Sequence, residues 1–223
     1  MMEKVIEIIR YLLSIPKSIY FNFKYFPLET AIRFPVVVSH KVKFRKLSGT
    51  IKLEKIKLGG VRIGFGSMEC YEFKSTPTIF RNTGEIIFKG KCKIGYGSVI
   101  SNEGKIIFGE NVNTTKTSII CREKIEIGND CLFGWDCLIM DTDHHHIYDS
   151  QDLKNKINEN KKIYIGDHVW LGAKVTVLKG TEIPKDNIVA IGTTVNQKIL
   201  KSNIVIANDL KIKVIKENIY WKE

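Results

Sequence analysis

The chain has 223 residues, the size of one large domain, and its apolar fraction of 43% is ordinary for a protein that buries a core. Its formal net charge is +11, and the excess lies at both ends: residues 1–50 carry nine Lys or Arg against three Glu, and residues 198–223 carry six Lys against three acids. No nucleic-acid recognition motif accompanies these basic ends. The composition therefore argues against a nucleic-acid partner and favours an anionic membrane lipid or an anionic cofactor.

The five cysteines are an odd number and form no CxxC pair. This usage predicts reduced thiols in a cytoplasmic protein rather than a disulfide framework. We expect the cysteines to be buried as small apolar groups, Cys131 and Cys137 among them, rather than to act in catalysis.

An amphipathic helix is predicted over residues 2–14, with an apolar face formed by Val5, Ile8, Ile9, Leu12 and Leu13. Pro16 is expected to end it. Charged residues interrupt the apolar run, so the segment reads as neither a membrane span nor a signal peptide. Aromatic residues then cluster around Lys24 between Tyr20 and Phe26. Two interpretations stay open: the segment packs on the open end of the fold, or residues 1–27 make peripheral contact with a membrane.

Apolar residues recur every six positions in the C-terminal half, at Ile165, Leu171, Val177, Ile183, Val189 and Val195. Compact residues follow four positions after each, as at Val169 and Val175. The period continues upstream at Ile127, Phe133 and Ile139, and more weakly at Ile94 and Ile100. Neither a helix nor a simple strand has this period, so it predicts short strands joined by tight corners and stacked into a parallel β-solenoid of about seven coils.

The repeat is interrupted once, between Ile139 and Ile165, by a polar stretch without Gly or Pro. A long insertion in a regular solenoid is typically functional or disordered. This one contains Asp141, Asp143 and the consecutive residues His144, His145 and His146. Histidine transfers protons near neutral pH, so the loop is the predicted catalytic element.

The segments CLFGWDCLIMDTDHHHIYD, IGDHVWLGAKVTVLKGTEIPKDNIVAIGTTVNQ and IVIANDLKIKVIKEN resemble the hexapeptide-repeat acyltransferases. The likeness is to the maltose/galactoside O-acetyltransferase-like branch, and within it to enzymes that acetylate capsular or lipopolysaccharide sugars. It is strong over residues 127–217 and weaker over 40–126. It implies a left-handed parallel β-helix, a homotrimer with active sites between subunits, and direct transfer of an acyl group from acetyl-CoA to a sugar acceptor.

The same resemblance assigns residues to roles. The family's Asp-x-His pattern falls on Asp143, His144 and His145, which makes His145 the expected base and His144 its competitor if the loop register slips. Asp141 or Asp143 would orient the imidazole, and the sequence does not choose between them. For the cofactor, the VWLG segment supplies Trp170 and Gly172, and the residues matching the rest of the family's strip are Ala173, Ile191, Asn196, Gln197 and Lys211. Ala173 would act through its backbone N–H, and Lys211 would meet a phosphate of coenzyme A.

Together these features predict a mostly all-β chain in three parts. Residues 1–40 form the N-terminal amphipathic and aromatic segment, residues 41–207 form the β-helix with a protruding loop at 143–162, and residues 208–223 form a short C-terminal helical segment. The expected enzyme is a cytoplasmic O-acetyltransferase that needs no metal, at the inner face of the membrane if residues 1–27 contact lipid.

Three other functions stay open at this point. One is an N-acyltransferase acting on an amino-sugar nucleotide. Another is a carbonic-anhydrase-like metalloenzyme, which needs histidines on separate coils, where this chain offers only His40 and His168 outside the loop. The third is a solenoid that binds sugars without catalysis, against which the histidine loop and Trp170 argue.

Overall fold

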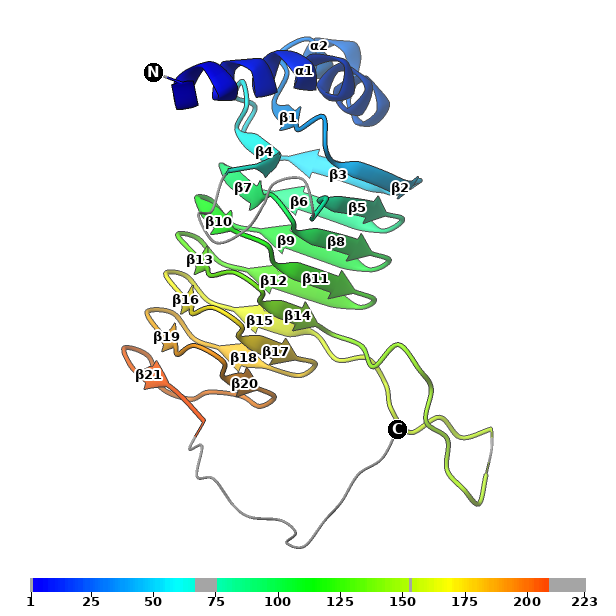
Figure 1. Ribbon diagram of the computed structural model, residues 1–223. Coiled ribbons are helices and arrows are strands. Elements are labelled where there is room, and N and C mark those ends of the chain that lie inside the picture. Colours follow the sequence, from blue (N-terminus) through cyan, green and yellow to red (C-terminus); the bar gives the residue numbers. More distant parts are fainter. Residues whose placement is uncertain (1, 67–75, 153, 209–223) are drawn as a thin grey trace, which may run out of the picture.

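The computed structural model describes residues 2–66, 76–152 and 154–208, with side chains from residue 7 onward. Short parallel strands stack into three sheets that form the sides of a β-helix, and a helix lies across its N-terminal end (Figure 1). The predicted C-terminal helical segment, apart from residue 208, lies outside the described residues, and so does Lys211.

The first sheet has eight strands, in the order β1 (Val36–Val38), β4 (Val61–Phe65), β7 (Cys92–Gly95), β10 (Val112–Thr114), β13 (Leu132–Phe133), β16 (Trp170–Leu171), β19 (Ile188–Val189) and β21 (Val205–Ile206). The second sheet has seven, in the order β2 (Lys43–Leu47), β5 (Ile79–Asn82), β8 (Val99–Asn102), β11 (Ser118–Cys121), β14 (Leu138–Met140), β17 (Thr176–Leu178) and β20 (Thr194–Val195). The third sheet has six, in the order β18 (Glu182–Ile183), β15 (Ile163–Ile165), β12 (Lys124–Ile127), β9 (Lys105–Phe108), β6 (Glu85–Phe88) and β3 (Thr50–Leu53).

The six-residue repeat forms the core, as predicted. Its apolar positions are all buried, from Ile94 and Ile100 through Ile139 to Val195, and the compact positions between them are buried as well. Each inward side chain stacks on its equivalent in the next coil, because the strands pair in register; Ile139, for example, lies between Ile119 and Val177. Burial of a side chain of this size contributes roughly 1.5–3 kcal/mol to folding, so the stacked column dominates the stability of the chain.

The corners of the β-helix impose two separate constraints: some positions need left-handed backbone, and others need a residue without a side chain. One column of corners uses Asn111, Asp130, His168, Asp186 and Asn203, all with φ between 54° and 60°. Asn, Asp and His tolerate this conformation better than most residues. Where the chain of the next coil passes directly beneath, only glycine fits: a Cβ on Gly134 would lie 2.7 Å from the backbone nitrogen of Ala173.

The N-terminal helix is longer than predicted, and the expectation that Pro16 ends it is wrong. Helix α1 runs from Met2 to Tyr25 with Pro16 inside it, and the short helix α2 (Leu28–Ala31) follows. Hydrogen bonds to the first coil on both sides of the proline hold the helix: Ser14 Oγ accepts from His40 N at 3.0 Å, and Ser18 Oγ accepts from Val38 N at 2.9 Å. With those of Asn22, these bonds offset the roughly 3 kcal/mol that an internal proline costs.

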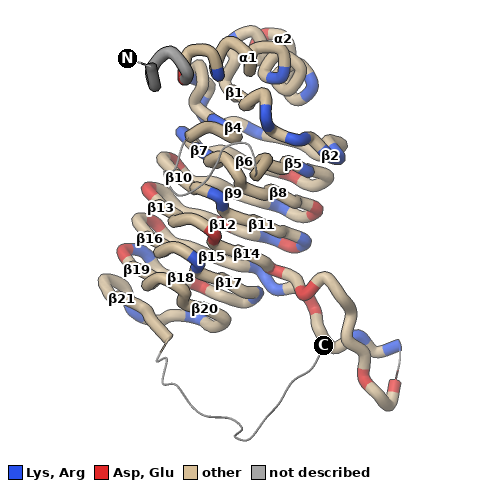
Figure 2. Tube along the Cα trace, in the orientation of Figure 1, with Lys and Arg blue, Asp and Glu red and all other residues tan. Residues whose placement is uncertain are grey.

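Helix α1 covers the first coil (Figure 2) with a face made of Ser14, Ser18 and Asn22 together with the fully buried Phe21. Buried Ser14, Ser18 and Asn22 bond to the backbone of β1 and its flank, and Asn22 both donates to Val36 O (2.6 Å) and accepts from Val36 N (3.2 Å). The helix thereby satisfies an edge strand that would otherwise be unpaired. No helix in the described part of the chain is long and apolar enough to cross a bilayer.

Candidate active site

The histidine loop leaves the β-helix between β14 and β15 and protrudes from it as a long arm (Figure 1). Buried Asn158 organises its base. Its Nδ2 donates to the carbonyl oxygen of His145 (2.7 Å) and to Asp143 Oδ2 (2.9 Å), and its Oδ1 accepts from Ile147 N (2.6 Å). The backbone of His145 also donates to Asp143 O at 2.7 Å. The main chain around His145 is therefore held in one conformation, while the imidazole is exposed.

Asp143 is tied to the β-helix as well as to the loop. Lys179, just after β17, donates to Asp143 Oδ2 at 2.5 Å and to Glu159 O at 3.1 Å. The Lys179 ammonium, with help from Asn158, holds the pKa of the Asp143 carboxyl below its ordinary value, so this carboxylate is charged at neutral pH.

Asp141 has a structural role that separates it from the histidines. Its carboxylate is buried and accepts the backbone N–H groups of Arg122 (2.7 Å) and Glu123 (2.9 Å). Asp141 belongs to a column of inward-pointing side chains at equivalent corners of successive coils. In this column Asn102 donates to Asn82 at 2.8 Å and Cys121 Sγ donates to Asp141 at 3.4 Å. Of the two carboxylates that the sequence left open, Asp143 is the one beside the loop's histidines.

The three histidines differ in their surroundings. His144 has φ of 62°, and its Nδ1 lies 3.4 Å from Arg122 Nη2. The ring of His146 meets that of Tyr148 edge-on at 6.2 Å. All three side chains are exposed, and His145 differs in having neither kind of side-chain partner among the described residues.

Trp170 lies on the outer face of the first sheet, with 49% of its surface exposed. It is paired in register with Leu132 above and Ile188 below, both of which are also exposed. These three side chains line a hollow of about 470 Å³ together with the polar corner residues His168, Asp186 and Asn203. An apolar strip of this kind, exposed to solvent and edged with polar groups, is suited to an extended ligand.

A notch follows this strip at the next corner. Trp135, Ala173 and Ile191 occupy successive turns there, because Lys174 N donates to Trp135 O (2.7 Å) and Gly192 N donates to Ala173 O (2.9 Å). Trp135 and Ile191 are 38% and 67% exposed, whereas Ala173 between them is 7% exposed. The small residue therefore lies recessed between two projecting side chains. A Cβ at Gly172 would lie 2.8 Å from Ile191 N, so Gly172 permits this close stacking.

The other predicted cofactor residues lie elsewhere. Asn196 follows β20 and lines a hollow of about 310 Å³ at the base of the histidine loop, together with Thr142, Asp143 and Lys179. Gln197 is exposed beside it, and the next residue, Lys198, pairs with Glu182 at 2.7 Å.

The predicted site residues thus fall into two groups that one chain does not bring together. His145, Asp143 and Asn196 lie where the second sheet turns into the third, whereas Trp170, Gly172, Ala173 and Ile191 lie on the first sheet and its corner toward the second. Figure 1 shows the loop and β16 on opposite sides of the β-helix.

The structure also bears on other chemistries. Burial raises the pKa of the thiols of Cys131 and Cys137 to about 11, and those of Cys92 and Cys121 are raised further, so all four are protonated at neutral pH and unsuited to act as nucleophiles. Within the described ranges, no three His, Cys, Asp or Glu residues are grouped to hold a metal ion. His168 instead contacts Asp186 at 3.0 Å on an exposed corner.

Sequence reasoning missed three residues of these groups. Asn158 and Lys179 position the loop, but an Asn in a polar stretch and a Lys on an outward strand position carry no signal in a single sequence. Trp135 follows Gly134 at a corner, as Ala173 follows Gly172, and this parallel could have revealed it.

Comparisons with known proteins place the chain in a family. No family model matches it. WbbJ of Escherichia coli (strain K12), whose name assigns it provisionally as an O-acetyl transferase of lipopolysaccharide biosynthesis, is 31% identical over 146 residues, which are 61% of this chain and 74% of that protein. The polysialic acid O-acetyltransferase of Neisseria meningitidis is 49% identical over 57 residues, only 26% of each chain. That of Escherichia coli O1:K1 is 28% identical over 56% of this chain and 41% of its own length.

The crystal structure of the polysialic-acid-specific acetyltransferase NeuO has the same fold, with a TM-score of 0.55 and 22% identity over 80% of this chain and 77% of that one. The fold is the left-handed parallel β-helix, as expected. The chain belongs to the hexapeptide-repeat acyltransferases. It spans less than half the length of the two polysialic acid O-acetyltransferases matched by sequence.

Proposed function

We propose that the chain is an acetyl-CoA-dependent O-acetyltransferase that acts on a sugar of a capsular polysaccharide or lipopolysaccharide, or on a precursor of one. Membership of the family and the names of its relatives support this assignment. The observation that carries it is that one chain supplies both an exposed His145, fixed through its backbone by Asn158, and an exposed apolar strip with a recessed Ala173 beside it.

In the proposed mechanism, His145 takes the proton of the acceptor hydroxyl as that oxygen attacks the thioester carbonyl. The same imidazolium then protonates the departing thiolate, so the proton balance closes within one residue. The backbone N–H of Ala173 would stabilise the thioester oxygen, which explains why an alanine suffices there. Trp170 would hold the pantetheine arm against the apolar strip, and the charged Asp143 would stabilise the imidazolium from the same loop.

The assay for this function is release of free thiol from acetyl-CoA in the presence of sugar acceptors. We expect His145→Ala to lower the rate by about 10²- to 10⁴-fold, the range for a lost general base, and to fold normally because the imidazole is exposed. His146→Ala is the matched control and is expected to keep its activity. Full activity in His145→Ala, with loss in His144→Ala, would move the base by one residue. Transfer to amino sugars alone would establish the N-acyltransferase alternative.

We further propose a homotrimer in which each active site uses the loop of one copy and the strip of its neighbour. The separation of the two groups of residues in a single chain supports this arrangement. Two inactive variants, His145→Ala and Trp170→Glu, would be unfolded together and reassembled in equal amounts. With random mixing, about one quarter of the interfaces combine an intact loop from one copy with an intact strip from its neighbour. About a quarter of the wild-type activity should therefore return. No recovery in mixed trimers would place the complete site within one chain.

We also propose that residues 1–27 contact the cytoplasmic face of a membrane. The polarity of α1 supports this, because its polar side is buried against β1 and its apolar side is exposed. The exposed apolar residues are Ile8, Ile9, Leu12, Leu13, Ile15, Ile19, Tyr20 and Phe23. A helix lying in a lipid interface buries such a face, and three parallel copies would present three of them to one plane.

Co-sedimentation with vesicles of phosphatidylcholine and phosphatidylglycerol tests this contact. Leu12→Gln should weaken binding about tenfold or more, because burying one leucine contributes roughly 1.5–3 kcal/mol. Leu200→Gln, at an even more exposed leucine near the other end of the β-helix, is the matched control and should change nothing. Equal binding of the two variants would remove α1 from the membrane.

A further inference from the structure

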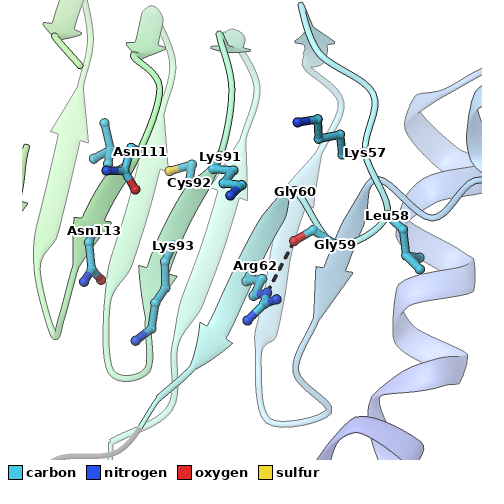
Figure 3. A pocket seen from close by; sticks show the side chains of 11 residues that line it. Lys57, Leu58, Gly59, Gly60, Arg62, Lys91, Cys92, Lys93, Asn111 and Asn113 are labelled. Carbon is cyan, nitrogen blue, oxygen red and sulfur yellow. Dashed lines mark hydrogen bonds between the residues drawn. The ribbon is translucent and has the colours of Figure 1, made fainter. Parts of the chain in front are cut away.

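A basic hollow lies on the outer face of the first sheet, in its N-terminal half, far along the β-helix from the histidine loop. It has a volume of about 380 Å³ and lies over β4, β7 and β10. Figure 3 shows Arg62, Lys93 and Asn113 in one row on neighbouring strands, with Lys57, Lys91 and Asn111 beside them. Four cations and two amides therefore line the hollow, and none of the described residues that line it is acidic.

These four cations differ from most others on the β-helix in having no carboxylate partner within the described residues. Elsewhere cations are paired, as Lys105 and Lys52 both are with Glu85 at 2.8 and 2.6 Å. Arg62 and Lys93 are even placed directly opposite each other in the parallel register. Like charges in such a position destabilise a sheet, so the fold gains nothing from this arrangement. An anion between the two side chains would reverse the sign of that interaction.

The nearest acids do not serve as counterions for the hollow. Glu110 pairs with Lys55, which, with smaller contributions that include Lys57, holds the pKa of the Glu110 carboxyl below its ordinary value. Asp130 accepts a hydrogen bond from Asn111 Nδ2 at 2.8 Å. Among the described residues, Arg62 makes one hydrogen bond, from Nε to the carbonyl oxygen of Gly59 at 3.3 Å, and its two terminal nitrogens have no partner there.

The basic hollow and the candidate cofactor strip belong to one continuous ladder of outward side chains. In register, Arg62 is followed by Lys93, Asn113, Leu132 and Trp170. Three strand spacings separate Lys93 from Trp170, which is about 14 Å. A ligand bound to the cations would thus extend along the same face toward Trp170, on the side away from Asn196, Gln197 and the last coils.

We propose that this hollow binds the anionic groups, carboxylates or phosphates, of an acidic glycan that serves as the acyl acceptor. The proposal rests on the proposed acetyltransferase function and gives its acceptor a chemical class. Arg62 and the lysines supply charge-assisted bonds to such groups, and the amides of Asn111 and Asn113 can bond to sugar hydroxyls. Among the described residues that line the hollow, none is an aromatic side chain on which a base could stack. The hollow also lies on the side of the β-helix rather than on the end covered by α1. Both features favour a glycan over a nucleic acid or a lipid surface.

The test compares three probes on the purified full chain by calorimetry at low and high salt. The probes are oligomers of polygalacturonic acid, inorganic pyrophosphate and, as a neutral control, oligomers of dextran. We expect the acidic oligomers to bind, dextran not to bind, and salt to weaken the binding. The double variant Arg62→Gln/Lys93→Gln should weaken acidic-oligomer binding at least tenfold. Its control, Lys46→Gln/Lys201→Gln, removes two exposed cations outside the hollow and should bind as the wild type does.

Each other outcome overturns the proposal in a specific way. Equal binding by the two double variants, or binding of dextran as strong as that of the acid, would exclude the hollow as an acidic-glycan site. Loss of acetyl-CoA affinity in Arg62→Gln/Lys93→Gln would make it a cofactor site, and loss of vesicle binding would make it a lipid site. Pyrophosphate without polyuronate binding would limit the ligand to phosphates. Binding is measured without acetyl-CoA, so its result does not depend on the assay of thiol release. Binding of the acidic oligomers without any acyl transfer would overturn only the proposed function.

Discussion

Asn158→Ala should release the histidine loop while leaving the β-helix intact. The side chain makes three hydrogen bonds, two of them with backbone groups of His145 and Ile147 and one with the charged carboxylate of Asp143. Neutral bonds contribute about 1 kcal/mol each and one to a charged group about 1.5–3 kcal/mol, so the ordered conformation loses roughly 4 kcal/mol. That is a shift of about 10²- to 10³-fold in the local opening equilibrium of the loop.

Hydrogen exchange over residues 143–148 measures that shift directly, and thiol release reports its effect on activity. We expect faster exchange in the loop, unchanged exchange in β14 and β17, and a rate lowered by up to the same factor. Asn155→Ala is the matched control, because Asn155 lies in the same loop with an exposed side chain. If the two variants exchange alike, Asn158 does not hold the loop and the reasoning is wrong.

Three further predictions follow from the same contacts. Trp170→Ala should raise the KM for acetyl-CoA with little change in melting temperature, since the ring is half exposed; an unchanged KM would remove Trp170 from the cofactor strip. Phe133→Ala should lower the free energy of unfolding by about 3–5 kcal/mol, measured by denaturant titration, whereas the same change at its exposed neighbour Leu132 should cost far less. Because Lys179 holds the Asp143 pKa low, the loop should stay protected from hydrogen exchange at neutral pH and lose that protection as acid is added. Lys179→Met should move the loss of protection to higher pH. If the pH dependence of exchange does not move, the ion pair does not hold the loop.

The β-helix could be predicted because its period leaves a mark on every turn. A buried position such as Ile139 must be apolar in each coil, and a corner such as Gly134 must be small where the next coil passes beneath it. Stacking imposes the same constraint on every coil, so the repeats within one sequence can be compared with each other as homologues would be. The histidine loop was visible for the converse reason, as the one long interruption of a regular pattern.

Helix α1 shows what such reasoning lacks. Amphipathicity identified its apolar face but left open whether that face packs on the fold or faces outward. Here the edge of β1 offers unpaired backbone groups, and Ser14, Ser18 and Asn22, at intervals of four residues, satisfy them. Those long-range bonds also hold the helix together across Pro16, where local propensity predicts an end. The wrong helix end therefore comes from tertiary hydrogen bonds, which local sequence patterns do not encode.

The site itself shows why a solenoid of this kind is suited to sharing its chemistry between copies. The interior is filled by stacked side chains, so functional groups can only project outward, and those on different sides of the triangle diverge. His145 and Trp170 are an instance: His145 lies in the loop between β14 of the second sheet and β15 of the third, whereas Trp170 lies in β16 of the first sheet. The arm is stiffened near its base by Asn158 and Lys179 rather than left free, which is what delivery of an imidazole to another surface requires. A base placed in this way would be effective only in an assembly, so dilution below the dissociation constant of that assembly should abolish acyl transfer while the fold of each chain persists.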